Sequence, residues 1–185
     1  MATIGLVPMA GRPFHLGHDC LIRIASREND AVRVFTSFGD RGSISGAGMA
    51  RVWEELIVPT LPANVSVEFV TSPVGSVYKV LGDADAAGSV DRHSVYSDAV
   101  DCERNYATLG RYAGRMLNAG LIVLRGVPRS ETVEVSGTQM RAWFDSGDRR
   151  SFVSMVPPGV GGDAMWDILK GTPVVARKKA SRRGA

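Results

Sequence analysis

Cysteine is scarce in this sequence: Cys20 and Cys102 are the only two among 185 residues. They lie far apart and match no zinc-binding or redox spacing, which excludes a disulfide-rich secreted scaffold and fits a reducing compartment. No stretch approaches the roughly 18 consecutive apolar residues of a membrane span. The first residues lack the charged and apolar segments of a secretion signal. We therefore expect a soluble, cytoplasmic protein.

An excess of one charge is also absent from most of the chain. The formal net charge is +3, but the last nine residues carry five positive charges, so residues 1–176 sum to −2. The charged residues of this end are Arg177, Lys178, Lys179, Arg182 and Arg183. We expect residues 173–185 to form a disordered basic tail, which either only aids solubility or weakly contacts nucleic acid or another polyanion.

Short apolar segments alternate with amphipathic ones along the rest of the chain. Strands are predicted at residues 3–7, 31–35, 65–70, 93–96 and 121–124. Helices are predicted at about 17–27, across Met49 to Ile57, at 74–88, and from an Asp101 cap to Gly120, with a helical pattern from Pro128 to about residue 170. Residues 1–172 are expected to form one domain. The predicted fold class is α/β: a Rossmann-like, doubly wound, five-stranded parallel sheet with helices on both faces and a helical C-terminal part.

Two of the three histidines lie together directly after the first predicted strand. Residues 13–18 read Pro-Phe-His-Leu-Gly-His, so His15, Gly17 and His18 fall at the carboxyl edge of the sheet, where such folds bind ligands. A helix amino terminus offers free N–H groups, glycine allows close approach of a ligand, and imidazoles donate hydrogen bonds to phosphate. This pattern favours a phosphate site. A metal pair or structural histidines at a turn are the alternatives.

A second candidate motif opens a predicted helix near the carboxyl end. Residues 135–141 read Val-Ser-Gly-Thr-Gln-Met-Arg. Ser136 followed three residues later by Gln139 is a capping box, which any helix can use. Alternatively, this helix start directs N–H groups, the hydroxyls of Ser136 and Thr138, and the guanidinium of Arg141 at phosphates. The two interpretations are compatible.

Together these motifs resemble the signature of the nucleotidylyltransferase superfamily, which is built around His-x-Gly-His. The superfamily's second hallmark is a Ser/Thr-rich turn before a helix near the carboxyl end, followed by an arginine. The motifs of this chain are most similar to the nicotinamide-nucleotide adenylyltransferase and cytidylyltransferase-like branches. The resemblance covers nearly the whole chain except the tail, including a Pro-rich exit at Pro157-Pro158. One departure is that Gly11-Arg12 stands two residues nearer the histidines than in the adenylyltransferase branch. This variant looks like divergent, bacteriophage-encoded members.

The resemblance implies direct in-line transfer, in which a phosphate oxygen of an acceptor attacks the α-phosphate of ATP and pyrophosphate leaves with Mg²⁺. It implies that His15 and His18 contact the α- and β-phosphates, and that Ser136, Thr138 and Arg141 contact the β- and γ-phosphates. The other nucleotide-binding candidates are Pro13, Phe14, Gly17 and Gly137. Nicotinamide mononucleotide or a similar phosphorylated compound is the expected acceptor. No protein ligand is assigned to a metal, and homo-oligomers are common in the superfamily.

Three further residues are candidates for binding the second substrate. Arg12 precedes the histidines and is expected to reach a phosphate. Ser37 lies in residues 36–41, at the end of the second predicted strand, and Asp98 lies in residues 96–98, at the end of the fourth. Both segments are expected to face the cleft. Asp98 is expected either to hold a ribose hydroxyl or to form a loop turn before the next helix.

Three conspicuous side chains are interpreted as structural. His93 starts a predicted strand, and Trp53 and Tyr112 fall on or beside the packed stripes of predicted helices. We expect both aromatic side chains to lie in the core.

Three other functions stay open at this point. The first is a cytidylyltransferase that forms a CDP-activated compound, although Val-Ser-Gly-Thr-x-x-Arg resembles adenylyl-transfer motifs more closely. The second is a non-catalytic nucleotide-binding protein of the same fold. The third is a nucleic-acid-binding protein, an interpretation that depends on the basic tail alone.

Overall fold

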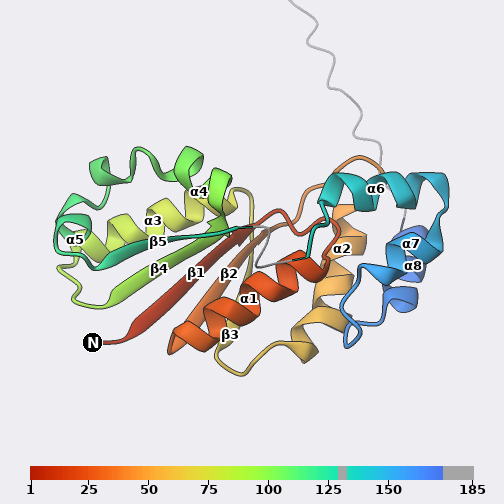
Figure 1. Ribbon diagram of the computed structural model, residues 1–185, viewed down its shortest axis with the longest axis horizontal. Coiled ribbons are helices and arrows are strands. Elements are labelled where there is room, and N and C mark those ends of the chain that lie inside the picture. Colours follow the sequence, from red (N-terminus) through yellow and green to blue (C-terminus); the bar gives the residue numbers. More distant parts are fainter. Residues whose placement is uncertain (129–132, 173–185) are drawn as a thin grey trace, which may run out of the picture.

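Five parallel strands form one sheet in the order β3–β2–β1–β4–β5 (Figure 1). The structure is a computed structural model that describes residues 1–128 and 133–172, so the predicted tail at 173–185 lies outside the described residues. The strands are β1 (Thr3–Met9), β2 (Ala31–Ser37), β3 (Val65–Val70), β4 (Arg92–Asp98) and β5 (Ile122–Val127). Leu6 of β1 lies opposite Arg33 of β2 and Val95 of β4, so β1 is paired on both sides. The predicted α/β fold class is confirmed.

Helices cover both faces of the sheet. Neighbouring residues of β1 point apolar side chains to opposite faces, so each face needs a layer of helices to bury them. On one face lies α1 (Leu16–Glu28), and on the other lie α3 (Pro73–Ala86), α4 (Ala99–Tyr106) and α5 (Gly114–Asn118) (Figure 1). Val7 packs in the cluster that contains Ile22 of α1. Leu6 packs in the cluster that contains Leu81 of α3.

The remaining helices lie beyond the carboxyl ends of the strands (Figure 1). They are α2 (Gly46–Val52), continued by η1 (Trp53–Ile57) and η2 (Val58–Thr60), then α6 (Gly137–Ser146), α7 (Arg149–Ser154) and α8 (Gly162–Gly171). Trp166 joins the last three, because its ring centroid lies 5.1 Å from that of Phe144 and 5.2 Å from that of Phe152. Trp53 is 1% exposed, which confirms its predicted place in the core. No helix in the described ranges is long and apolar enough to cross a membrane.

The single helix predicted from Asp101 to Gly120 is wrong. The chain forms α4, a 3-10 turn η3 (Leu109–Arg111) and the short α5, and Asp98 caps α4 by accepting the Val100 N–H at 3.1 Å. Glycines at positions 110 and 114 weaken a continuous helix here. The break turns Tyr112 outward, where it is 60% exposed, so its predicted burial is also wrong. The helical pattern predicted after Pro128 first appears as a helix at Gly137, and residues 129–132 lie outside the described residues.

Candidate functional site

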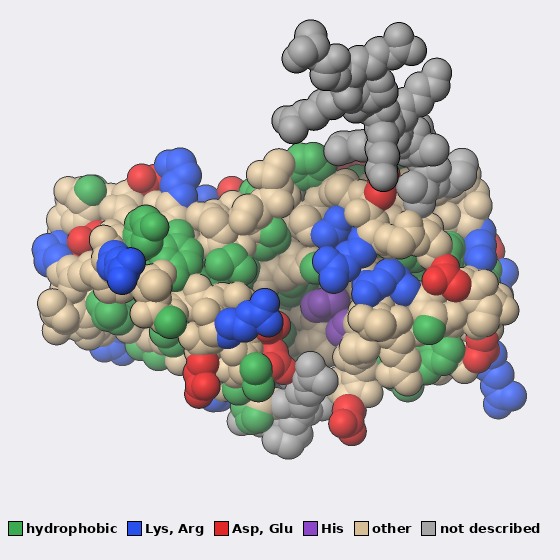
Figure 2. All heavy atoms as spheres, turned by 90° about the horizontal axis from the view of Figure 1, so that it is seen from above, with side chains coloured by type: hydrophobic (Ala, Val, Ile, Leu, Met, Phe, Trp, Pro, Cys, Tyr) green, Lys and Arg blue, Asp and Glu red, His purple; other side chains and the backbone are tan. Residues whose placement is uncertain are grey.

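A cleft of about 540 Å³ opens at the carboxyl ends of the strands. Residues at or just beyond the ends of all five strands line it, among them Met9, Ser37, Thr71, Asp98 and Val127. The chain runs outward from β1 to β2 and β3 and then returns to β4 on the other side of β1. Such a switch in strand order is where doubly wound sheets bind ligands. Figure 2 shows the hollow with histidine side chains inside it.

The two motif histidines form one stacked unit at the start of α1. The ring centroids of His15 and His18 lie 3.8 Å apart with an interplanar angle of 24°. The His15 carbonyl accepts the N–H of His18 at 2.9 Å, which fixes the relative position of the two residues. Buried Phe14 stacks on His18, with ring centroids 5.7 Å apart, and meets Trp53 edge-on at 5.0 Å. The pair is therefore held from behind by the core, with both imidazoles lining the cleft.

Gly17 makes room for this stack. A Cβ atom at position 17 would lie 3.1 Å from Cε1 and 3.2 Å from Nδ1 of His15, closer than ordinary van der Waals contact. The missing side chain thus lets the His15 ring lie back over the first turn of α1. The sequence predicted that this glycine serves the approach of a ligand, and the close neighbour in the structure is the histidine itself.

Both imidazoles are neutral near pH 7. Burial lowers the pKa of His15 to about 4, and burial followed by repulsion from His15 places the pKa of His18 well below its usual range. The Nδ1 atoms of both rings are buried and have no hydrogen-bond partner among the described residues. A neutral imidazole carries one N–H donor, so the pair offers hydrogen bonds to a ligand without a fixed positive charge.

The second motif meets the first across the cleft. Ser136 caps α6 by accepting the Gln139 N–H at 3.1 Å, as the capping interpretation predicted. Arg141 donates from Nη1 to the Arg12 carbonyl at 2.9 Å, a contact between residues 129 positions apart. A Cβ atom at Gly137 would lie 3.2 Å from that Nη1, so glycine allows this contact. Ser136 and Gly137 line the cleft beside the histidines.

Thr138 occupies a different place from the one predicted. Its side chain is exposed and does not line the cleft, and its Oγ1 accepts a hydrogen bond from Nη2 of Arg141 at 2.9 Å. The hydroxyl therefore orients the guanidinium of Arg141. Pro13 and Phe14 are buried behind the cleft wall and do not line it.

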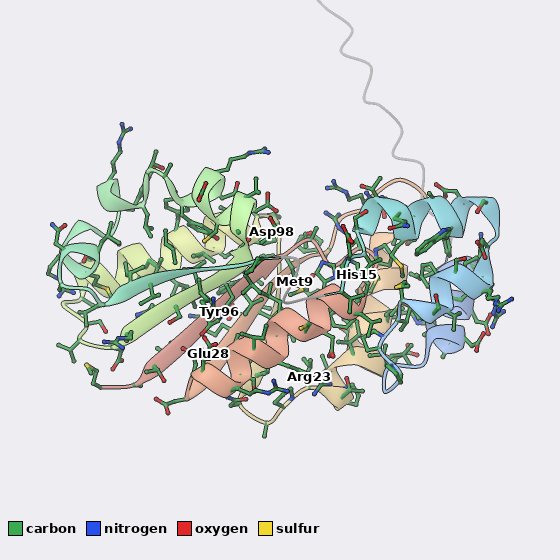
Figure 3. The ribbon with its side chains drawn as sticks, viewed as in Figure 1. Met9, His15, Arg23, Glu28, Tyr96 and Asp98 are labelled. Carbon is green, nitrogen blue, oxygen red and sulfur yellow. The ribbon has the colours of Figure 1, made fainter. Side chains whose placement is uncertain are left out.

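The candidates for the second substrate reach the cleft, but one neighbour does not. Ser37 lines the cleft and donates to the Ala10 carbonyl at 3.2 Å, and Asp98 lines it as the cap of α4. Tyr96 was expected to face the same space and is instead 1% exposed, bonded to Glu28 at 2.8 Å and Asn29 at 2.7 Å beneath α1. Tyr96 lies two residues before the end of β4, where α1 still covers the side chains on this face of the sheet. Figure 3 shows Tyr96 beside Glu28 and away from Asp98.

The sequence reasoning missed the wall between β3 and α3. Thr71, Ser72 and Pro73 line the cleft there, and Ser72 caps α3 by accepting the Gly75 N–H at 3.2 Å. The available signal was a Ser-Pro pair directly after a predicted strand, since every such strand end falls at the same edge.

No group of three or more His, Cys, Asp or Glu side chains that could hold a metal occurs within residues 1–128 and 133–172. Two carboxylates, Asp98 and Asp101, line the cleft. One or two carboxylates are what Mg²⁺ uses when substrate phosphates provide its other ligands. The residues present thus fit Mg²⁺ that arrives with a nucleotide.

No protein-family model matches this sequence, and no curated protein matches it significantly. Among solved structures, one similar chain is TmcAL of Thermotoga maritima, in a crystal structure with alpha-thio ATP bound. The TM-score is 0.53 and the sequence identity is 16%, over 92% of this chain and 55% of the TmcAL chain. This chain therefore spans about half the length of TmcAL. At this identity the similarity shows the fold alone: the two proteins share an α/β architecture.

Proposed function

We propose that this protein is a nucleotidylyltransferase that transfers AMP from ATP to a phosphorylated acceptor such as nicotinamide mononucleotide, with release of pyrophosphate. The observation that carries the proposal is the contact of Arg141 with the Arg12 carbonyl, which joins the second motif to the loop that bears His15. Two motifs far apart in sequence thereby line one cleft at the switch in strand order. The ATP analogue bound to the similarly folded TmcAL supports ATP as the donor.

The reaction needs no covalent enzyme intermediate. A phosphate oxygen of the acceptor forms a bond to the α-phosphorus, and the bond from that phosphorus to the oxygen bridging the β-phosphate breaks. Pyrophosphate carries away the electron pair, and Mg²⁺ would neutralise part of its charge. The protein's contribution is positioning and stabilisation of negative charge that grows on the α-phosphate and the leaving group.

Each motif has a separate role in this proposal. His15 and His18 donate hydrogen bonds to the α- and β-phosphates from their neutral rings. Ser136 and the first N–H groups of α6 face the β- and γ-phosphates, where Arg141 adds charge. Thr138 acts as a positioning residue for Arg141, since its hydroxyl contacts that guanidinium.

The first test is pyrophosphate release with Mg²⁺, ATP or CTP, and nicotinamide mononucleotide. We expect release with ATP that depends on the acceptor, and we expect His18→Ala to lower the rate by about 10²–10³-fold, the usual effect of removing one charge-stabilising donor. The matched control is His93→Gln, because His93 lies outside the cleft with its Nδ1 3.2 Å from the Asp91 carbonyl. The thermal unfolding midpoint of each variant shows whether it is folded.

The other outcomes separate the remaining functions. Release with CTP alone would move the protein to the cytidylyltransferase alternative. Thermal stabilisation by ATP without release under any of these conditions would indicate a nucleotide-binding protein that does not catalyse transfer. A folded His18→Ala variant with full activity would overturn the role given to the histidines.

A further inference from the structure

Tyr112 is the most exposed aromatic residue in the described part of the chain. It follows η3, in the break between α4 and α5, and is 60% exposed. Phe38, at 48%, is the other exposed aromatic residue there. A single exposed ring is common on protein surfaces, so its surroundings decide what it can bind.

The ring of Tyr112 is held in place by two other tyrosines. It meets the ring of Tyr78 on α3 edge-on, with centroids 5.1 Å apart and an interplanar angle of 77°. Tyr78 in turn stacks on buried Tyr106 of α4 at 5.7 Å, and its hydroxyl donates to the Asn105 carbonyl at 2.8 Å. The backbone is fixed as well, because the Tyr112 N–H donates to the Leu109 carbonyl at 2.9 Å. A ring held in this way loses little conformational freedom when a partner binds it.

Two arginines of the same segment have no carboxylate partner. Arg111 directly precedes Tyr112, and Arg104 lies on α4, one residue before Asn105. Both are exposed, and neither forms an ion pair within the described ranges. The exposed carboxylate next to them in sequence, Glu103, is turned by about 160° around α4 from Asn105, whereas Arg104 is turned by about 100°. No ion pair of the protein therefore neutralises these two cations.

This combination fits the chemistry of single-stranded nucleic acid. An aromatic ring stacks on the flat face of any base, and arginines bind the phosphates between bases. In a duplex the bases already stack on one another, so the ring can bind only an unpaired base. An apolar protein partner fits less well, because both cations would then lose water without gaining an anion. The last nine residues, with their five positive charges, add attraction for any polyanion.

We propose that Tyr112, Arg104 and Arg111 form a binding site for single-stranded nucleic acid, in which a base stacks on the tyrosine ring and the two guanidiniums contact phosphates. None of the three residues lines the cleft, so the site does not depend on the function proposed above. It adjoins the cleft all the same, because Asn105 lines the cleft wall and accepts the hydrogen bond of Tyr78. Figure 2 shows Lys and Arg side chains among hydrophobic ones on the half of the molecule that carries α3, α4 and α5.

The test is fluorescence anisotropy with a labelled single-stranded RNA of about 12 nucleotides, within the usual size of such sites, and with the same strand paired to its complement. We expect the full chain to bind the single strand more tightly than the duplex. Tyr112→Ala should weaken binding of the single strand by about 5- to 100-fold, the usual effect of removing one stacked ring, and should leave binding of the duplex unchanged. Tyr112→Phe should keep the wild-type affinity, because phenylalanine keeps the aromatic face.

The arginines are tested by the salt dependence of binding to the single strand. The logarithm of the binding constant falls with the logarithm of the salt concentration by about 0.7 for each phosphate contact, so Arg111→Gln should reduce this slope by about 0.7 and Arg104→Gln/Arg111→Gln by about 1.4. The matched control is Arg27→Gln in the last turn of α1, since Arg27 is also exposed and forms no ion pair with any described residue. This control should leave the slope unchanged. The thermal unfolding midpoint of each variant shows whether it is folded.

The outcomes separate this site from diffuse attraction and from the enzymatic proposal. Equal affinities of wild type and folded Tyr112→Ala for the single strand would overturn the site, as would an equal loss for single strand and duplex. Absence of measurable RNA binding by the full chain would overturn it as well, and a slope reduced as much by Arg27→Gln as by Arg111→Gln would overturn the part given to the arginines. A loss confined to the single strand would support the site whether or not the protein releases pyrophosphate.

Discussion

His15 and His18 show how residue-level chemistry is set by packing. Two imidazoles with centroids 3.8 Å apart cannot both be positively charged at low cost, and burial disfavours the charged form of each. The ordinary histidine pKa of 6.5 would leave part of the pair charged just below neutral pH, whereas His15 has a pKa of about 4. The site therefore keeps one protonation state of the pair through the physiological range.

This burial predicts a dependence of stability on pH. Between pH 6.5 and about 4, the unfolded chain takes up a proton at His15 that the folded protein excludes. The contribution to stability is complete above pH 6.5 and is lost as the pH falls toward 4. At about 1.4 kcal/mol per pKa unit, His15 alone removes about 3 kcal/mol from the free energy of unfolding, and His18 adds to the loss.

The measurement is denaturant unfolding at about pH 7 and about pH 4.5, for wild type and for the double variant His15→Asn/His18→Asn. We expect the double variant to lose much less stability between the two conditions, because asparagine does not titrate. His93 also has a pKa lowered by burial, so a smaller loss remains in both proteins. An identical pH dependence of the two proteins would show that the histidine pair does not titrate as inferred.

At the scale of elements, α6 connects the two motifs. Its first residues cap the helix and line the cleft, and Arg141, which follows them, reaches back to the loop after β1. The same short segment thus caps the helix and positions the guanidinium of Arg141. The sequence allowed capping and phosphate binding together, and the structure agrees in that Ser136 caps the helix while lining the cleft.

Thr138→Val tests whether the hydroxyl on α6 orients Arg141. The substitution keeps the β-branched shape but removes the acceptor of the 2.9 Å bond from Nη2. We expect about a tenfold rise in KM for ATP, and a change in the free energy of unfolding within about 1 kcal/mol, the usual worth of one hydrogen bond. Steady-state kinetics over a range of ATP concentrations measures this.

Two further variants make the result specific. Thr138→Ser keeps the hydroxyl and should restore the KM. Ser146→Ala, at the other end of α6, removes a hydroxyl bonded at 3.1 Å to the Trp143 carbonyl and should leave KM unchanged. If Thr138→Ser behaves like Thr138→Val, the methyl packing and not the hydrogen bond is what matters.

At the scale of the whole molecule, the strand order creates the cleft. The loop after β1 leads to α1 on one face of the sheet, and the loop after the neighbouring β4 leads to α4 on the other face, so the two loops separate. The start of α6 then lines one side of this opening. The net positive charge of the protein does not come from this folded part of the chain. Five of the positive charges stand in the last nine residues, and residues 1–176 sum to −2.

Deletion of residues 177–185 tests the two parts of the chain separately. The formal charge falls from +3 to −2, so we expect any weak, salt-sensitive DNA binding of the full chain to disappear. Pyrophosphate release should be unchanged, because every residue proposed to act precedes the deletion. Fluorescence anisotropy with a short DNA duplex at low and high salt, together with the release assay, measures both. Loss of release on deletion would place the tail in the reaction.

The sequence by itself determined the α/β class and the five strands, because apolar periodicity and turn residues act over short distances along the chain. It also determined which residue types follow the strand ends, and hence that His15, His18 and Ser136 share one edge of the sheet. Buried Trp53 followed from helical periodicity as well.

Only the tertiary structure decided which of these side chains touch. The bond from Arg141 to the Arg12 carbonyl joins residues 129 positions apart, so it depends on the strand order and on the position of α6. The same holds for Arg41 beside that pair, for Thr138 turned toward Arg141, and for Tyr96 covered by α1. Local pattern reports where a side chain stands on its own element, whereas its neighbours, its burial and thus its pKa come from how the elements pack.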